Sequence, residues 1–294
     1  MEKIIECDRI THYYGNRLIY ADLSFEVEKG KVLGLLGKNG TGKTTIINIL
    51  NGYLKPRSGV CRLFGEDMNS LSPATKSRVG LLLEGHVQHT YFTVQQIEKF
   101  YAAFFPNWKK EAYYELLKKL QVLPTQKLST MSCGQRSQVA LGLLFAQDPE
   151  LLILDDFSMG LDPGYRRLFV EYLKEYASAE NKTVFLTSHI IQDMERLIDD
   201  CIIMDYGSIL VQQSLDDLMH RLRKYTCKVP EGYQPHLPAD CYHPTVLRQT
   251  LETCAFLSPA EMEKLLKENQ VPFSELKSSE VSLEDAFIGL TGKY

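Results

Sequence analysis

The sequence lacks any apolar segment long enough to cross a membrane as a helix. Its continuous apolar runs, such as residues 81–83 and 151–154, are far shorter than the roughly 20 apolar residues that span a bilayer. The first residues mix charged with apolar side chains, which is not the pattern of a secretory signal. These features predict a soluble protein that stays in the cytoplasm.

Clustered cysteines and an excess of positive charge are also missing. The seven cysteines are scattered without a Cys-x-x-Cys pair, which favours reduced thiols and disfavours a structural zinc site. The formal net charge is −4. Since nucleic-acid binding needs a basic patch or stripe, we expect no nucleic-acid partner.

The order of apolar patterns predicts an α/β protein. The first thirty residues alternate between apolar and polar, as the strands of a half-buried antiparallel sheet do. Residues 32–37, 151–154 and 183–187 are continuous apolar runs separated by helical patterns, which is typical of buried parallel strands joined by crossover helices. The expected fold is an α/β core with an N-terminal antiparallel β subdomain.

Two further regions complete the predicted organisation. Residues from about 88 to 147 are rich in helix formers and predict an inserted helical subdomain. Prolines interrupt the chain after residue 215, and Ser258-Pro259 then has the pattern of a helix N-cap followed by proline in the first turn. We therefore expect one main domain over residues 1–215 and a small α+β accessory region over residues 216–294.

One dense motif of glycine, lysine and threonine follows the first apolar run. Residues 37–44 read G-K-N-G-T-G-K-T, which matches the phosphate-binding pattern G-x-x-x-x-G-K-[ST]. The motif lies between a predicted strand and a helix predicted over residues 45–50, so backbone N–H groups and a helix N-terminus face the phosphates. We expect Lys43 to reach the β and γ oxygens of ATP and the Thr44 hydroxyl to bind Mg²⁺. This motif makes the expected α/β core that of a P-loop NTPase and residues 1–215 a nucleotide-binding domain. The predicted nucleotide-binding residues here are Gly37, Lys38, Asn39, Gly40, Thr41, Gly42, Lys43, Thr44 and Thr45.

Acidic residues and a histidine follow the next two apolar runs. The run 151–154 ends in Asp155 and Asp156, and the run 183–187 is followed by Ser188 and His189. We expect Asp155 to hold Mg²⁺ through water and Asp156 to face the attacking water, with His189 near the γ-phosphate. Acidic residues at a strand end also serve as caps of a following helix.

Taken in this order, the segments resemble those of ABC-type ATP-binding subunits, from residue 4 to about residue 210. The signature loop of that family, usually L-S-G-G-Q, corresponds to M-S-C-G-Q at residues 131–135, ahead of a helix predicted over residues 136–146. The resemblance implies that Ser132 and Gly134, with Gln135 beside them, contact ATP held by the opposite subunit. It therefore implies a head-to-tail dimer, either of this chain or with a second ATP-binding subunit.

The same resemblance assigns further roles. It implies that Tyr14 stacks on adenine, although a plain strand residue would look the same in the sequence. It also implies that Asp162 touches the second subunit and that His189 senses the γ-phosphate. The ending V-S-L-E-D-A-F-I-G-L-T-G at residues 281–292 is similar to that of the exporter-associated, ABC-2-like group, in which a separate membrane subunit has about six helices. The implied function is an ATPase that drives export from the inner face of the membrane.

Three positions depart from the family pattern. Asp156 stands where the family has glutamate, and its side chain is shorter by one methylene, so we expect slow hydrolysis. Glu84 stands where a water-sensing glutamine is usual, and we expect it to accept from water or to reach Mg²⁺. Cys133 replaces the first glycine of the signature loop. These changes fit two arrangements equally: a slow homodimer, or one subunit of an asymmetric pair.

Aromatic residues are dense shortly after Glu84. The resemblance implies a groove here that receives a helix of the membrane subunit, whereas such density is more often helix core. If the groove is present, some of the aromatics should be exposed. The aromatic residues of this segment are Tyr91, Phe92, Phe100, Tyr101, Phe104, Phe105 and Trp108.

Two alternative functions stay open at this point. A soluble ABC ATPase without a membrane partner would typically carry a coiled-coil insertion or two nucleotide modules. Here about ninety residues without heptads separate Gly42 from Ser132, and there is one module. A regulatory subunit that binds ATP but hardly hydrolyses it is compatible with Asp156. The sequence does not identify the transported molecule, and we lean toward an amphipathic or antimicrobial peptide.

Overall fold

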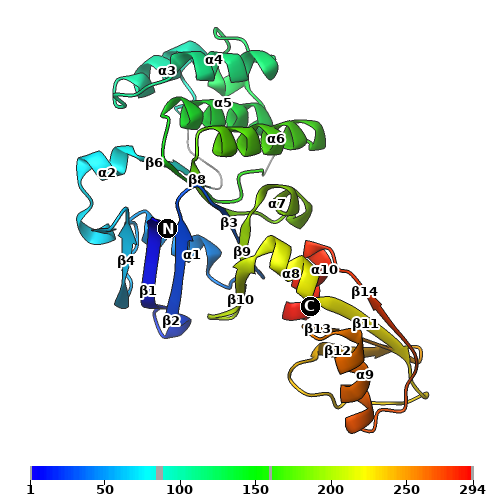
Figure 1. Cartoon of the computed structure of the whole chain (residues 1–294). Helices are drawn as coiled ribbons and strands as arrows, with labels where there is room; N and C mark the ends of the chain where they lie inside the picture. Colours follow the sequence, from blue (N-terminus) through cyan, green and yellow to red (C-terminus); the bar gives the residue numbers. More distant parts are fainter. Residues whose placement is uncertain (1, 84–88, 159–160, 293–294) are drawn as a thin grey trace. The chain divides into compact units, whose positions relative to one another are not determined.

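Figure 1 shows the computed structural model of the chain, which describes residues 2–83, 89–158 and 161–292. The chain divides into two compact units. The first comprises Met1–Leu35 and Gly42–Ile198, and the second comprises Leu36–Thr41 and Asp199–Tyr294. The domain boundary that we propose near residue 215 falls at the start of a helix of the second unit. None of the helices in the described ranges is both long and apolar enough to cross a membrane.

An antiparallel sheet forms one layer of the first unit. Its strands follow the order β2-β1-β4-β5. Apolar side chains alternate with exposed ones along β1 and β2, which explains the period of two in the sequence. The strands are β1 (Lys3–Tyr14), β2 (Arg17–Glu28), β4 (Ser58–Leu63) and β5 (Glu66–Asp67).

Parallel strands form the core of the first unit. They are neighbours in the order β3-β8-β7-β6, with Val32 opposite Val184 and Val79 opposite Leu151. Every residue of β7 and β8 is buried, as their continuous apolar sequences predict. Because β7 and β8 are parallel, the residues that follow them meet at one edge. The strands are β3 (Val32–Gly37), β6 (Val79–Leu82), β7 (Leu151–Leu154) and β8 (Thr183–Thr187).

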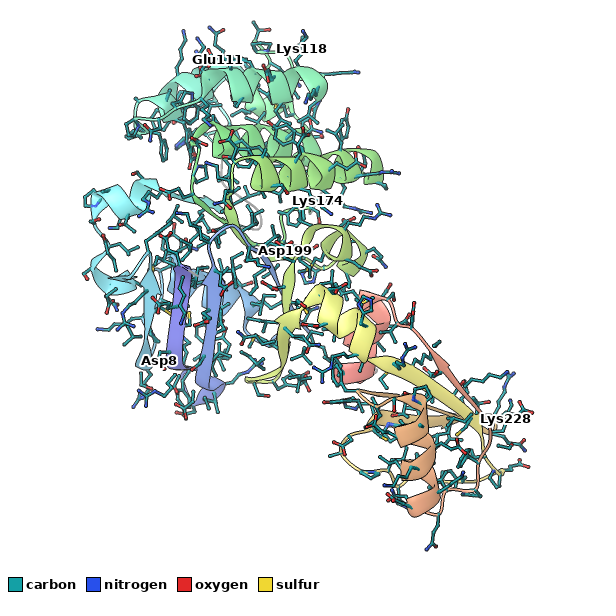
Figure 2. All side chains as sticks on the ribbon, in the orientation of Figure 1. Asp8, Glu111, Lys118, Lys174, Asp199 and Lys228 are labelled. Carbon is teal, nitrogen blue, oxygen red and sulfur yellow. The ribbon has the colours of Figure 1, made fainter. Side chains whose placement is uncertain are left out.

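The predicted inserted region contains three α-helices, two of which, α3 and α4, pack against the third, α5. Glu111 and Lys118 lie on the outer side of α4 (Figure 2), while Tyr113, Leu116 and Leu117 of the same helix are buried. The helices of the first unit are α1 (Lys43–Leu50), α2 (Pro73–Ser77), α3 (Val94–Ala102), α4 (Lys110–Lys119), α5 (Cys133–Ala146), α6 (Pro163–Ala179) and α7 (Ile191–Leu197). Short 3₁₀ turns occupy Met68–Ser70 and Leu128–Thr130.

Two helices begin earlier than predicted. The helix that we expected over residues 136–146 begins at Cys133, because the Ser132 side chain accepts a hydrogen bond from the backbone N–H of Gln135 and caps it. The helix that we expected over residues 45–50 begins at Lys43. In both cases the sequence motif itself supplies the first helical turn.

The second unit contains a smaller antiparallel sheet with helices. The strands β12, β13, β11 and β14 lie in that order, and β9 pairs with β10. The predicted N-cap at Ser258 and proline in the first turn are confirmed in α9. The elements are β9 (Asp200–Asp205), β10 (Ser208–Ser214), α8 (Leu215–Arg221), β11 (Arg223–Lys228), β12 (Tyr242–Leu247), β13 (Thr250–Ala255), α9 (Pro259–Glu268), β14 (Ser274–Ser279) and α10 (Leu283–Thr291).

The α+β extension has a core of its own. Its buried side chains come from β11, β13, α9 and the segments that join them. They are Tyr225, Cys227, Val229, Cys241, Leu251, Ala255, Met262, Leu266 and Val271. The predicted fold class is therefore confirmed, including the small C-terminal extension.

Candidate functional site

The phosphate-binding loop has glycine where side chains cannot fit. Gly40 and Gly42 have left-handed backbones, with φ of 80° and 101°. A Cβ atom on Gly42 would lie 2.5 Å from the Tyr20 hydroxyl oxygen. The helix α1 begins at the next residue, and no side chain caps it. The N–H groups of its first turn, with the positive end of the helix dipole, therefore suit an anion.

Tyr20 supports this loop, a role that the sequence does not predict. Its ring is fully buried, and its hydroxyl donates a hydrogen bond to the carbonyl oxygen of Gly42. Burial raises the pKa of the Tyr20 phenol well above its ordinary value, so the hydroxyl stays protonated and able to donate. The alternating pattern of β2 predicts that Tyr20 is buried but contains no sign of its contact.

Lys43 and the two aspartates after β7 share an electrostatic environment. Burial lowers the pKa of the Lys43 ammonium from its ordinary 10.5, and the charges of Asp155 and Asp156 oppose that shift. The Thr44 side chain, one residue on, is exposed. The structure therefore places the lysine and both carboxylates of the predicted site within electrostatic reach of each other.

Thr187 at the end of β8 holds the two aspartates in place. Its hydroxyl donates to Asp155 Oδ1 at 2.7 Å and accepts from the backbone N–H of Asp156 at 3.1 Å. Both carboxylates are almost fully buried. Since a buried carboxylate needs hydrogen-bond partners, this bridge lets the charges sit beside the phosphate loop.

Asp156 and His189 are in contact, as their positions after neighbouring strands predict. The backbone N–H of His189 donates to Asp156 Oδ1 at 3.2 Å, and the imidazole Nε2 lies 3.5 Å from Oδ2. The backbone of Asp156 is left-handed, with φ of 44°, a conformation that aspartate adopts more readily than most residues. The His189 side chain is exposed, whereas that of Asp156 is buried, so the imidazole is the solvent-accessible part of the pair.

The oxygens present fit a magnesium nucleotide rather than a free metal ion. Among the described residues no group of three or more histidine, cysteine, aspartate or glutamate side chains could hold a metal. A nucleotide site needs only one or two protein oxygens, because phosphates and water supply the others. The exposed Thr44 hydroxyl and the Asp155 carboxylate suit that role. The predicted ligand Glu84 lies outside the described residues.

Other predicted contacts of the nucleotide come from the end of β1 and from the first half of the phosphate loop. Tyr14 is 48% exposed, and its hydroxyl accepts from the Thr45 hydroxyl at 3.5 Å, so its ring stands beside α1. Asn39 is exposed. The Thr41 hydroxyl donates to the carbonyl of Lys38 at 2.8 Å, and the Lys38 ammonium donates to the carbonyl of Thr291 at 2.6 Å. Stacking of Tyr14 on adenine stays a prediction.

The signature residues form the start of α5. Ser132 accepts from the N–H of Gln135 at 3.2 Å, and the Gln135 side chain accepts from the N–H of Ser132 at 3.1 Å. Ser132 and Cys133 are exposed, and Gly134 follows in the first turn. Figure 1 shows α5 among the other helices of the inserted region, away from α1. Their contact with ATP on a second copy stays a prediction.

Asp162 caps the next helix. Its Oδ1 accepts from the N–H groups of Gly164 and Tyr165 at 3.0 and 3.2 Å. This is the local role that acidic residues near a strand end often have. The predicted contact of Asp162 with a second subunit stays a prediction.

The expected exposure of aromatic residues near α3 is confirmed. Tyr91 and Phe104 are 69% and 64% exposed, and Phe100 is also exposed. Phe100 contacts Phe104 and Phe92, and Phe92 contacts Tyr91 in turn, so the rings form one continuous group. We call Tyr91, Phe92, Phe100 and Phe104 the aromatic patch. An exposed apolar group of this kind is typical of a protein interaction site.

Comparison with known proteins identifies the family of the chain. Residues 20–158 match the family model described as "ABC transporter". The chain is 30% identical to Nod factor export ATP-binding protein I of Burkholderia orbicola (strain AU 1054), over 98% of this chain and 97% of that one. It is 29% identical to bacitracin transport ATP-binding protein BcrA of Bacillus licheniformis, over 99% and 98%.

A solved structure supports the fold. The ATP-binding subunit of an ABC transporter superposes with a TM-score of 0.67, at 24% identity, over 74% of this chain and 92% of that one. The part of this chain beyond the match is about a quarter, similar in size to the C-terminal extension. At this level of identity the likeness concerns the fold alone.

Proposed function

Because this chain belongs to the ABC transporter family, as an ATP-binding protein, we propose that it binds and hydrolyses ATP to drive export through a separate membrane subunit. The observation that carries this proposal is the convergence of Lys43, Asp155 and the Asp156–His189 pair beside a phosphate loop. Relatives named for Nod factor export and bacitracin transport support an export role.

Different residues of the chain have different roles in hydrolysis. The Lys43 ammonium and the N–H groups of α1 bind the β- and γ-phosphates, and Thr44 and Asp155 hold the metal ion. When bound there, Mg²⁺ would neutralise part of the negative charge of the phosphates. Asp156 orients the attacking water and accepts its proton, while the backbone N–H of His189 fixes the carboxylate. Thr187 donates a hydrogen bond to the carboxylate of Asp155 and accepts one from the backbone N–H of Asp156.

A second ATP-binding subunit completes the site. Ser132 is exposed at the N-terminus of α5, where the positive end of the helix dipole favours a phosphate. Figure 1 shows α5 away from α1 of the same chain. A head-to-tail dimer of this chain or with a related subunit brings Ser132 and Gly134 of one copy to the ATP of the other, and Asp162 lies at the same interface.

The aromatic patch is the docking site of the membrane subunit. It is exposed and apolar, and its residues lie on α3 and in the segments on either side of it. A short amphipathic helix of a polytopic partner would bury these rings. The chain itself then works at the inner face of the membrane. Dimer closure around ATP would move the patch and so pass the nucleotide state to the partner.

Hydrolysis is slow in this proposal. The shorter Asp156 side chain leaves a longer contact to water than glutamate would, and its left-handed backbone is part of how the chain positions it. A regulatory subunit that binds ATP without turnover is the second candidate, because the same Asp156 favours it.

ATP turnover per chain, measured as a function of protein concentration, tests the proposal. A self-sufficient dimer gives specific activity that rises with concentration, and Lys43→Ala should lose both binding and turnover. Lys224→Ala, which changes a lysine of the extension outside the proposed site, is the matched control. ATP binding without turnover at any concentration would favour the regulatory candidate. No ATP binding by the unmodified chain would contradict the proposal.

A further inference from the structure

Lys38, the second residue of the phosphate loop, has a buried ammonium group. The side chain is only 8% exposed, and Nζ donates to the carbonyl oxygen of Thr291 at 2.6 Å. Burying an ammonium is costly unless strong acceptors compensate it. The Lys38 carbonyl in turn accepts from the hydroxyl and the N–H of Thr41. Lys38 therefore connects the turn of the loop with the last residue of α10.

The end of α10 is suited to a positive group. The last carbonyls of a helix have no partner within it, and they form the negative end of its dipole. Here the Thr291 carbonyl accepts from Lys38, and the Leu290 carbonyl lies 3.1 Å from His243 Nε2. The helix ends at Gly292, whose φ of 79° favours glycine. A Cβ there would lie 2.8 Å from the Nδ1 atom of His243.

The position of α10 is fixed by the C-terminal extension. Leu283, Ala286, Phe287 and Leu290 are buried, and the helix packs against β12, β13 and β9. At Gly289 the helix approaches β13 so closely that a Cβ atom would collide with the Cys254 sulfur. Because this packing restricts the movement of α10, the end of the helix is a fixed contact for Lys38.

We propose that α10 is a positioning element of the phosphate loop and that Lys38 is the residue through which it acts. This inference rests on the proposed ATP-binding function. A loop that is already ordered loses less conformational freedom when the nucleotide arrives, so the extension strengthens ATP binding without touching ATP. Lys38 is thus a positioning residue, and its ammonium serves the helix end rather than a phosphate.

The test is a double-mutant cycle on the full chain, with the Kd for ATP measured by calorimetry. Lys38→Met keeps the aliphatic stem but removes the charge, and we expect about tenfold weaker binding, the effect of one hydrogen bond to a charged group. Lys38→Arg can still donate to Thr291 and should restore most of the affinity. Thr291→Ala, which keeps the carbonyl, should change little.

Two glycine variants distinguish positioning from direct phosphate binding. Gly292→Ala forces a Cβ against His243 and displaces the end of α10. Gly232→Ala also places a side chain at a φ of 79°, but nothing lies within 4 Å of its Cβ. We expect Gly292→Ala to weaken ATP binding several-fold and Gly232→Ala to leave it unchanged. The double variant with Lys38→Met should bind no more weakly than Lys38→Met alone.

Independent, additive effects of Lys38→Met and Gly292→Ala would overturn the inference, because Lys38 would then act on the phosphate directly. Unchanged affinity in folded Gly292→Ala, checked by circular dichroism, would overturn it as well. ATP binding by the unmodified chain and by Lys43→Ala distinguishes failure of this inference from failure of the proposed function. If the unmodified chain binds no ATP, the proposed function itself is wrong.

Discussion

His189 contacts Asp156 through both its backbone and its ring. The N–H donates to Oδ1 at 3.2 Å, and Nε2 lies 3.5 Å from Oδ2, a contact that is an ion pair only when the imidazole is protonated. The two residues come from the ends of neighbouring parallel strands. Both carboxylate oxygens of Asp156 are thus oriented by one residue, and this orientation is what water activation needs.

Asp156→Asn should lower the turnover rate of ATP by about 100-fold or more while the Kd for ATP changes little. The amide keeps the shape and the acceptor at Oδ1, but it cannot take a proton from water. Removing the ring with His189→Ala should also lower turnover. Because the two act as a unit, the double variant should be no slower than Asp156→Asn. Additive losses in single-turnover assays would mean that the residues act independently.

Ser132→Ala should lower both stability and turnover. The lost cap of α5 costs about 1 kcal/mol of unfolding free energy. Ser258→Ala is the matched control, because Ser258 forms the same reciprocal cap with Glu261 at the start of α9. The midpoint temperature of thermal unfolding should fall in both variants, whereas turnover should fall only in Ser132→Ala. Equal turnover in the two would contradict a role for Ser132 at ATP.

Mixing two inactive variants should restore activity. A dimer of one Ser132→Ala chain and one Lys43→Ala chain has one site in which both halves are intact. An equal mixture should reach roughly a quarter of normal turnover, since half of randomly paired dimers are mixed and each has one complete site. Turnover that stays at the level of the separate variants would rule out sites shared between chains.

Tyr20→Phe should weaken ATP binding several-fold and lower the unfolding free energy by about 1 kcal/mol. The change removes one buried hydrogen bond to the Gly42 carbonyl. Tyr113→Phe offers a control of the same kind, since Tyr113 is equally buried and its hydroxyl donates to the Val94 carbonyl at 2.9 Å. Both variants should unfold more easily, and only Tyr20→Phe should bind ATP less well. Equal ATP affinities would show that the Tyr20 contact is purely structural.

Asp148 should make stability depend on acid pH. Burial alone would raise the pKa of its carboxyl, but hydrogen bonds from Lys182 and Lys109, and their charges, outweigh burial and lower the pKa from 3.8. Because the folded pKa is below the unfolded one, the stabilisation is complete above the unfolded pKa and is lost as the pH falls through the folded value. At neutral pH, Asp148→Asn should cost about 1 kcal/mol after allowance for solvent screening.

That cost should shrink when thermal unfolding of Asp148→Asn and the unmodified chain is compared at progressively lower pH below about 4. Asp8→Asn, at an exposed position of β1, should show no such convergence. A constant difference across the whole pH range would mean that the effect of Asp148 does not come from its charge.

Local patterns in the sequence predict much of the site. The phosphate loop is contiguous, and parallel strands necessarily end at one edge, so the sequence alone places Lys43, Asp155, Asp156 and His189 together. The same reasoning identifies Ser258 as a helix cap. In each case neighbours in sequence, or the regular geometry of a sheet, determine the contact.

Contacts between distant segments cannot be predicted in this way. In the sequence, Tyr20 has the pattern of any buried strand residue, and its neighbours do not indicate that it contacts Gly42. Lys38 and Thr291 are 253 positions apart. The predicted start of α5 is three residues late, because the signature motif resembles a loop although Ser132 and Gln135 form a capping pair. Such side-chain contacts depend on packing that a single sequence does not reveal.

The distribution of cysteines gives this chain a single accessible site for attaching a fluorescent dye. Six of the seven thiols are buried, and Cys133 alone is exposed, one residue after Ser132. A maleimide dye should therefore attach at that one place without engineering. Its emission would then report when another molecule covers the beginning of α5, so the closing and opening of an assembled pair could be followed in real time on the native protein.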